Sequence, residues 1–167
     1  MKKILLASIF LINLYGFNID EVTLSIGESR DNIKIYRLGV RKNFSSKWLK
    51  SSFGYFSGYY ELSINYWKGK SLDENFGVAL SPVFAYYLDF GNFKPFIEAG
   101  IGVSYFKEDK IDNRDLATNF LFEDRIGIGV KYRNIEGSFR FMHYSNGSIK
   151  EPNDGIDIWI ASISYRF

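Results

Sequence analysis

A histidine and a serine lie two residues apart near the end of the chain, in the run His143-Tyr144-Ser145. His143 is the only histidine among the 167 residues. On a β-strand, residues i and i+2 point to the same side and lie about 6.6 Å apart, so an imidazole can lean toward the neighbouring hydroxyl. A serine activated by a histidine is the pair of nucleophile and general base that hydrolyses esters and amides. The chemistry that this spacing indicates is therefore acyl transfer through Ser145.

A complete site of this kind also needs an acid and an oxyanion hole. Asp157 follows after a polar loop and begins a second alternating stretch. If the two stretches pair as antiparallel strands, Asp157 can lie opposite His143, with about 5 Å between their Cβ atoms. Glu151, within the loop, is the alternative acid. The backbone N–H groups of Asn146 and Gly147, where the strand passes into the loop, are the candidates for stabilising an oxyanion.

The elements that would position these residues are β-strands. Most of the chain alternates apolar and polar residues with the period of two that is typical of strands. In residues 124–132, for example, the apolar side chains alternate with Arg125, two glycines and Lys131. An apolar face opposite a face of small and charged residues suits a narrow membrane barrel, whose polar face lines the interior. The aromatic content of 19% favours strands, and tyrosines at the predicted strand ends fit the aromatic girdles of such a barrel.

The candidate site residues fall on the apolar face of the last two strands. That face carries Phe139, Phe141, Trp159, Ala161, Ile163 and Tyr165. Because the apolar face of a membrane barrel points outward, His143, Ser145 and Asp157 are predicted to lie on the outside, near the external rim. Ile158 and Ile160 depart from the pattern, since they put apolar side chains on the predicted interior face.

Eight strands can be placed along the chain. They are predicted at residues 20–30, 32–43, 53–67, 75–88, 93–106, 119–132, 136–146 and 155–167. Most connections alternate between short turns and longer polar loops, as in outer-membrane barrels. The connection at residues 44–52 is longer than this pattern expects, and the one around Asp31 is shorter. The final residue, Phe167, resembles the terminal aromatic of outer-membrane proteins. The prediction is an all-β protein, an eight-stranded antiparallel transmembrane β-barrel.

The start of the chain has the character of a secretory signal peptide. A short basic stretch precedes an apolar run at residues 4–17, which is too short to span a bilayer as a helix. We expect residues 1–17 to be the signal, cleaved near Gly16 or Phe17, and residues 18–167 to form a single barrel domain. The absence of cysteine excludes disulfides and a lipid-modified cysteine anchor. With 21 basic and 19 acidic residues, no charge bias points to nucleic acid.

The segment HYSNGSIKEPNDGID, residues 143–157, resembles the lipid A 3-O-deacylase (PagL) family. The family signature is a His-x-Ser-Asn run, then Pro-Asn-x-Gly, then an acidic residue that begins the final strand. The matching positions are His143, Ser145, Asn146, Pro152, Asn153 and Gly155. The signal, the chain length, the strand count and the terminal phenylalanine agree with the family over the whole chain.

The resemblance implies that Ser145 is the nucleophile and His143 the general base. Asp157 stands where the family has a glutamate that orients the histidine. An aspartate is one methylene shorter, so either the strands sit closer or the acid interaction is weaker. Glu151 remains the alternative at this point.

The resemblance also implies roles for the loop. Asn146 corresponds to an oxyanion-hole asparagine, and Asn153 to a loop asparagine that supports the site. Ser148 stands where the family has a glycine that accompanies the oxyanion-hole asparagine, three residues after the serine. Gly147 lies just before it.

The function that the resemblance implies is removal of the ester-linked 3-hydroxyacyl chain at position 3 of lipid A in lipopolysaccharide. The enzyme would lie in the outer membrane of a Gram-negative bacterium, with its site toward the outer leaflet. Its partners would be lipid A and other outer-membrane lipids, and the chemistry requires no metal or cofactor. The oligomeric state stays open. One alternative is a non-enzymatic small barrel with an adhesive or structural role, and another is a lipid A acyltransferase with its site inside the barrel.

Overall fold

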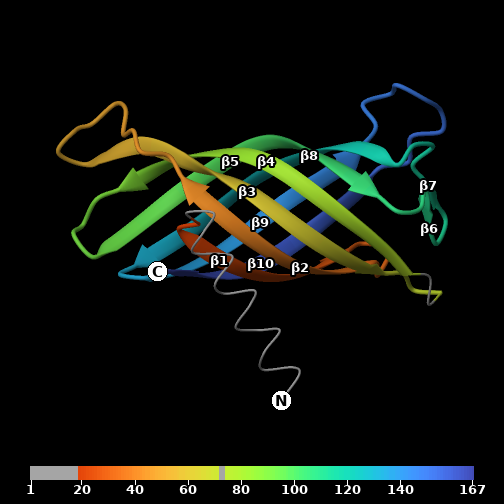
Figure 1. Cartoon of the computed structure of the whole chain (residues 1–167), viewed down its shortest axis with the longest axis horizontal. Coiled ribbons are helices and arrows are strands. Elements are labelled where there is room, and N and C mark those ends of the chain that lie inside the picture. Colours follow the sequence, from red (N-terminus) through yellow and green to blue (C-terminus); the bar gives the residue numbers. More distant parts are fainter. Residues whose placement is uncertain (1–18, 72–73) are drawn as a thin grey trace, which may run out of the picture.

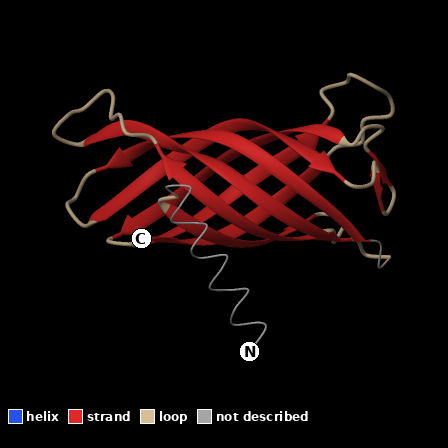
Figure 2. Cartoon of the chain, viewed as in Figure 1, coloured by secondary structure: helices blue, strands red, loops and turns tan. Residues whose placement is uncertain are grey.

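A computed structural model describes residues 19–71 and 74–167, and in these segments eight long strands close into an antiparallel barrel (Figures 1 and 2). The barrel strands are β1 (Glu21–Ser29), β2 (Lys34–Asn43), β3 (Gly54–Lys68), β4 (Glu74–Leu88), β5 (Phe93–Phe106), β8 (Phe120–Tyr132), β9 (Ile135–Ser145) and β10 (Ile156–Arg166). Two short strands, β6 (Lys110–Ile111) and β7 (Arg114–Asp115), pair with each other in the loop between β5 and β8. Neither described segment contains a helix long and apolar enough to cross a membrane.

The predicted fold is confirmed. Each barrel strand pairs with its neighbours along the chain, and β1 pairs with β10 to close the barrel. The predicted bounds of all eight strands agree with the observed bounds to within two residues. The β6–β7 hairpin was not predicted, and the predicted signal peptide, residues 1–17, lies outside the described residues.

The outer wall of the barrel is apolar. Many side chains that point outward from the middle of the strands are more than half exposed, among them Leu24, Ile64, Ile97, Ile101, Ile128 and Ile163. An exposed apolar band around a closed sheet is unfavourable in water and matches the hydrocarbon of a bilayer. The outward faces are the ones that the alternation predicted.

The interior is filled by paired charges. Within the described segments the buried ionic side chains are Arg37, Arg41, Arg125 and Arg140 with Glu21, Glu61, Glu98, Glu123 and Glu136. Glu61 illustrates the pairing, because its two oxygens accept hydrogen bonds from Arg37 and Arg41 at 2.7 Å each. Pairing offsets the cost of taking these charges out of water. The barrel therefore has a packed polar core, as expected for eight strands.

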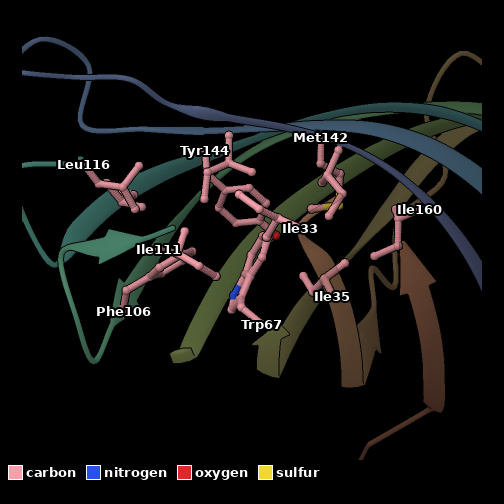
Figure 3. Close-up of a cluster of buried hydrophobic side chains, with 12 residues drawn as sticks. Ile33, Ile35, Trp67, Phe106, Ile111, Leu116, Met142, Tyr144 and Ile160 are labelled. Atoms are coloured by element: carbon pink, nitrogen blue, oxygen red, sulfur yellow. The ribbon is translucent and has the colours of Figure 1, made fainter. Parts of the chain in front are cut away.

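A cluster of buried apolar side chains caps this polar core at the end where β9 passes into β10 (Figure 3). Its members are Ile33, Ile35, Trp67, Phe106, Ile111, Leu116, Leu121, Met142, Tyr144, Ile156, Ile158 and Ile160. Ile158 and Ile160 point inward as the alternation required, and they are apolar because they belong to this cap. Tyr144 is also fully buried and donates a hydrogen bond to Glu123 at 2.8 Å. The backbone between His143 and Ser145 is thereby fixed to the barrel.

The two ends of the barrel differ. The end that carries the cap and the long loops is here called the loop end, and the end where residues 20 and 167 lie is called the terminal end. At the terminal end the long connection, residues 44–53, folds back onto the outer wall. Phe44 packs against Tyr60 and Phe84, with ring centroids 4.9 and 5.5 Å apart. The unusual length of this connection is explained by this packing.

Candidate active site

His143 and Asp157 lie directly opposite each other on β9 and β10. The Nδ1 atom of His143 and the Oδ1 atom of Asp157 are 2.7 Å apart. When the neutral imidazole donates from Nδ1 to a carboxylate, Nε2 is left without a proton and can accept one. The side chains are 40% and 59% exposed, on the outer wall of the barrel. The acid that contacts the histidine is therefore Asp157 and not Glu151, and the shorter side chain reaches the ring.

Ser145 is the last residue of β9 and points to the same side as His143. Its hydroxyl is partly exposed, and it makes no hydrogen bond with any residue in the described segments. Tyr144, between the two, points into the apolar cap. The alternation thus places the hydroxyl and the imidazole together on the lipid-facing side, at the loop end of the barrel.

Asn146 organises the loop that follows Ser145. Its side chain is buried, and its Nδ2 atom donates to the carbonyl oxygens of Leu116 at 2.9 Å and Lys150 at 2.8 Å. Its backbone N–H donates to Oδ1 of Asn153 at 3.0 Å. Asn146 and Asn153 are therefore bonded to each other, and the Asn146 amide, a predicted oxyanion donor, is already engaged.

A tight turn at residues 146–149 contains the N–H of Gly147, the other predicted oxyanion donor. The N–H of Ile149 donates to the carbonyl of Asn146 at 3.3 Å, and Gly147 and Ser148 have φ angles of 64° and 60°. Two central residues with positive φ are typical of a type I′ turn. The N–H of Gly147 donates no hydrogen bond to any residue that the structure describes. Ser148, which stands at the expected glycine, adopts the left-handed conformation that glycine takes most readily.

Gly155 forms one wall of the histidine site. Its φ is 60°, and a Cβ atom added there would lie 3.1 Å from Cε1 of His143. A side chain at position 155 would therefore press on the imidazole as well as strain the backbone. This close approach explains physically why the last residue of the Pro-Asn-x-Gly motif is a glycine.

Asp124 is a second carboxylate beside the histidine, and the sequence pattern did not single it out. The β8–β9 register pairs Asp124 with His143, on the side opposite Asp157. Its place on the apolar face of β8, in line with Ile126 and Ile128, was the signal that could have identified it.

An apolar groove of about 800 Å³ begins at these residues. It runs over the outer wall from His143 and Asp124 across β5 and β4 to Phe56 near the terminal end. Its apolar lining includes Phe56, Pro82, Phe84, Ile97, Ala99, Ile101, Ile126 and Phe141. A groove of this character can hold a hydrocarbon chain with its polar end at His143.

The closed eight-stranded barrel with an apolar outer wall defines the chain as a small outer-membrane β-barrel, here with a polar site on its lipid-facing surface. The family model described as Lipid A 3-O-deacylase (PagL) matches residues 34–166. The chain belongs to this family.

Individual relatives agree with this assignment. The chain is 36% identical to lipid A deacylase PagL of Pseudomonas aeruginosa over 99% of this chain and 98% of that protein. The crystal structure of the outer membrane enzyme PagL superimposes with a TM-score of 0.85 at 34% identity, covering 88% of this chain and 99% of that one. The N-terminal β-barrel domain of OprF from Pseudomonas aeruginosa, at 12% identity and a TM-score of 0.50, shares the fold alone, over 90% of this chain and 98% of that one.

Proposed function

We propose that this protein deacylates lipid A in the outer membrane by hydrolysing the ester that holds the 3-hydroxyacyl chain at position 3. The observation that carries the proposal is the 2.7 Å contact between His143 and Asp157 on the lipid-facing wall, beside Ser145. Polar groups that face hydrocarbon cost free energy, so their presence on this wall indicates a function. An oriented base beside a hydroxyl in that location fits a substrate that is itself a membrane lipid.

The first half of the reaction forms an acyl-enzyme. Oγ of Ser145 attacks the ester carbonyl carbon while Nε2 of His143 accepts the hydroxyl proton. Asp157 stabilises the resulting imidazolium through its contact with Nδ1. The tetrahedral intermediate then collapses, the bond to the sugar oxygen breaks, and His143 returns the proton to that oxygen.

The second half releases the fatty acid. A water molecule gives a proton to His143 and attacks the acyl carbon, and the Ser145 oxygen leaves with the proton that His143 returns. In both halves negative charge develops on the carbonyl oxygen. The N–H of Gly147, which donates to no residue that the structure describes and follows Ser145 by two positions, is the candidate donor to this oxygen. The hydrogen bond between Asn146 and Asn153 holds the turn in place.

The groove supports the same proposal, because it offers an apolar surface for the acyl chain whose ester lies at His143. The orientation supports it as well. Barrels of this class have both termini and most short turns on the periplasmic side, so the loop end faces outward and the site lies at the outer leaflet.

The test is mass spectrometry of lipid A from cells that express the chain or its Ser145→Ala variant. We expect loss of one 3-hydroxyacyl mass with the native chain and unmodified lipid A with the variant. If native, folded protein leaves lipid A unchanged in several membrane backgrounds, the proposal is wrong and a structural barrel is the better description.

The two carboxylates beside His143 give a graded version of this test. Removing the acid of a Ser-His-Asp triad costs on the order of 10⁴-fold in rate, so Asp157→Asn should lose at least about 100-fold. Asp124 makes no hydrogen bond to the ring, and Asp124→Asn should lose less than about tenfold. Initial rates on purified lipid A in mixed micelles measure both. If Asp124→Asn loses more rate than Asp157→Asn, then Asp124 is the acid that orients His143.

A further inference from the structure

A second cavity opens at the terminal end of the barrel, far from His143 along the barrel axis. It has a volume of about 530 Å³ and is bounded by the 44–53 connection, the turn at residues 89–92 and the ends of β8 and β10. Tyr55 and Tyr87 also line it, with their rings stacked 5.4 Å apart. We call it the terminal-end cavity.

The lining of this cavity is strongly basic. Its charged side chains are Lys42, Lys47, Lys94, Lys131, Arg133 and Arg166, with Asp20 as the one carboxylate in the lining that the structure describes. Half of the cations have carboxylate partners. Lys42 pairs with Asp20 at 3.2 Å, Lys131 pairs with Glu21 at 2.5 Å, and Lys94 pairs with Asp89.

The other three cations have no carboxylate partner in the described segments. Lys47 lies over the ring of Tyr55 at 4.1 Å, and Arg133 lies 5.4 Å from the ring centroid of Tyr132. Arg166 is exposed and lines the cavity, and its guanidinium has no ion pair with a residue that the structure describes. An unbalanced set of three cations around one cavity attracts an anion, and a guanidinium binds phosphate oxygens in a bidentate manner.

The cavity also lies at the level of a membrane surface. The segments that bound it carry exposed apolar side chains, which are Trp48, Leu49 and Phe53 in the 44–53 connection and Phe90 and Phe93 in and after the turn at residues 89–92. Aromatic residues at the end of a membrane barrel mark the boundary between hydrocarbon and headgroups. We therefore expect the phosphates of the adjoining leaflet at the height of Lys47, Arg133 and Arg166.

We propose that the terminal-end cavity binds a phosphate group, and that an anionic phospholipid of the adjoining leaflet is its source. Lys47, Arg133 and Arg166 contact the phosphate oxygens, while Tyr55 forms the apolar side of the site. This site is separate from the one that acts on lipid A, and it does not depend on that activity.

The experiment is native mass spectrometry of the purified, folded chain in detergent, titrated with phosphatidylglycerol, phosphatidylethanolamine or soluble glycerol phosphate. The test variant combines Lys47→Gln, Arg133→Gln and Arg166→Gln. The control combines Lys34→Gln, Lys68→Gln and Lys70→Gln, which removes the same charge at the loop end, where all three side chains are exposed.

We expect the test variant to bind phosphatidylglycerol about tenfold or more weakly, since each basic residue near an anionic lipid contributes roughly fivefold. The control should stay within about twofold of the native chain, and phosphatidylethanolamine should bind more weakly throughout. Circular dichroism verifies that both variants fold.

The three probes separate the sources of the phosphate. If the test variant binds phosphatidylglycerol more weakly and glycerol phosphate as well as the control does, the result supports the lipid site. If the test variant instead binds glycerol phosphate more weakly, the result supports a phosphate site that takes a soluble ester. Equal binding of every probe by the test variant and the control overturns the proposal. Lipid A deacylation, measured in parallel, tests the function at the other end independently.

Discussion

Single residues around His143 account for the conformation of the candidate site. Asp157 reaches the ring although it is shorter than the glutamate of the family, because the β9–β10 register sets the two residues directly opposite each other. Ser148 accepts a left-handed conformation in place of glycine. Gly155, in contrast, lies so close to His143 that an added Cβ would be 3.1 Å from the ring, which would then have to shift.

Gly155→Ala is expected to lower the rate of lipid A deacylation while the barrel still folds. The added methyl would lie 3.1 Å from Cε1 of His143, so the ring must shift by a few tenths of an ångström. Because a misplacement of about 1 Å can cost on the order of 100-fold in rate, this smaller shift should cost several-fold. The matched control is Gly91→Ala, because Gly91 also has a positive φ, 72°, but nothing lies within 4 Å of the added methyl. Both variants carry backbone strain, and only the first contacts the site. Equal rates in the two variants would contradict this role.

The face on which the candidate residues lie, and the pairing of Asp157 with His143, were predictable from the sequence, whereas the contacts within the loop were not. The alternation by itself placed His143, Ser145 and Asp157 on one outward face. It could not show that the Asn146 amide is engaged by Asn153, since this depends on how an irregular loop folds. Asp124 was missed because its proximity to His143 follows from the β8–β9 register.

Among the elements, the loop between β5 and β8 clamps the loop that carries the candidate oxyanion hole. The Asp154 N–H donates to the Asp115 carbonyl at 3.2 Å, and the Asp115 N–H donates to the Asp154 carboxylate at 2.7 Å. Leu116 accepts a further hydrogen bond from Asn146. Arg114 connects three segments, because it donates to Asp31 in the β1–β2 turn and to the carbonyl of Asp154. The β6–β7 hairpin is thus the element that fixes the loop between β9 and β10 through hydrogen bonds.

Arg114→Ala is expected to reduce deacylation roughly tenfold with a loss of stability below about 1 kcal/mol, because the ion pair to Asp31 is a third exposed. Hydrogen exchange of the amides at residues 146–155 should accelerate, which a purely structural effect on the barrel would not cause. Arg30→Ala, at the same end and without an ion pair to a described residue, is the control. Unchanged exchange in Arg114→Ala would refute the clamp.

The elements differ in how well the sequence predicts them. Long strands with strict alternation were placed to within two residues, because one face must meet lipid and the other the interior. The two-residue strands β6 and β7 carry no periodic signal. Their pairing depends on side-chain contacts such as the ion pair between Lys110 and Asp115 at 2.6 Å, which a pattern does not reveal.

At the scale of the whole molecule, the closed sheet and its ionic core stabilise each other. Glu61 contacts Arg37, Arg41 and Arg125, so it links strands across the interior. Charges of both signs in similar number leave little net charge to bury. The interior is thereby filled by paired side chains.

Glu61→Gln is expected to destabilise the barrel by about 3–5 kcal/mol, because it removes a buried carboxylate that Arg37, Arg41 and Arg125 share and leaves the interior with an excess of positive charge. Glu108→Gln removes an exposed carboxylate whose pair with Lys107 is 3.4 Å long, and it should cost less than about 1 kcal/mol. Denaturant titrations of the chain folded into lipid vesicles measure both. Similar midpoints for the two variants would show that the ionic core contributes little to stability.

The candidate reacting groups stand on the convex outer wall of the barrel, where a bilayer surrounds them. A lipid in the same leaflet meets them by diffusion in a plane, so the frequency of encounter depends on the number of substrate molecules per unit area. Inert lipid or detergent added at constant molar substrate lowers that density and slows turnover. The composition of the leaflet, expressed as a mole fraction, therefore takes the place that bulk concentration holds for an enzyme in water.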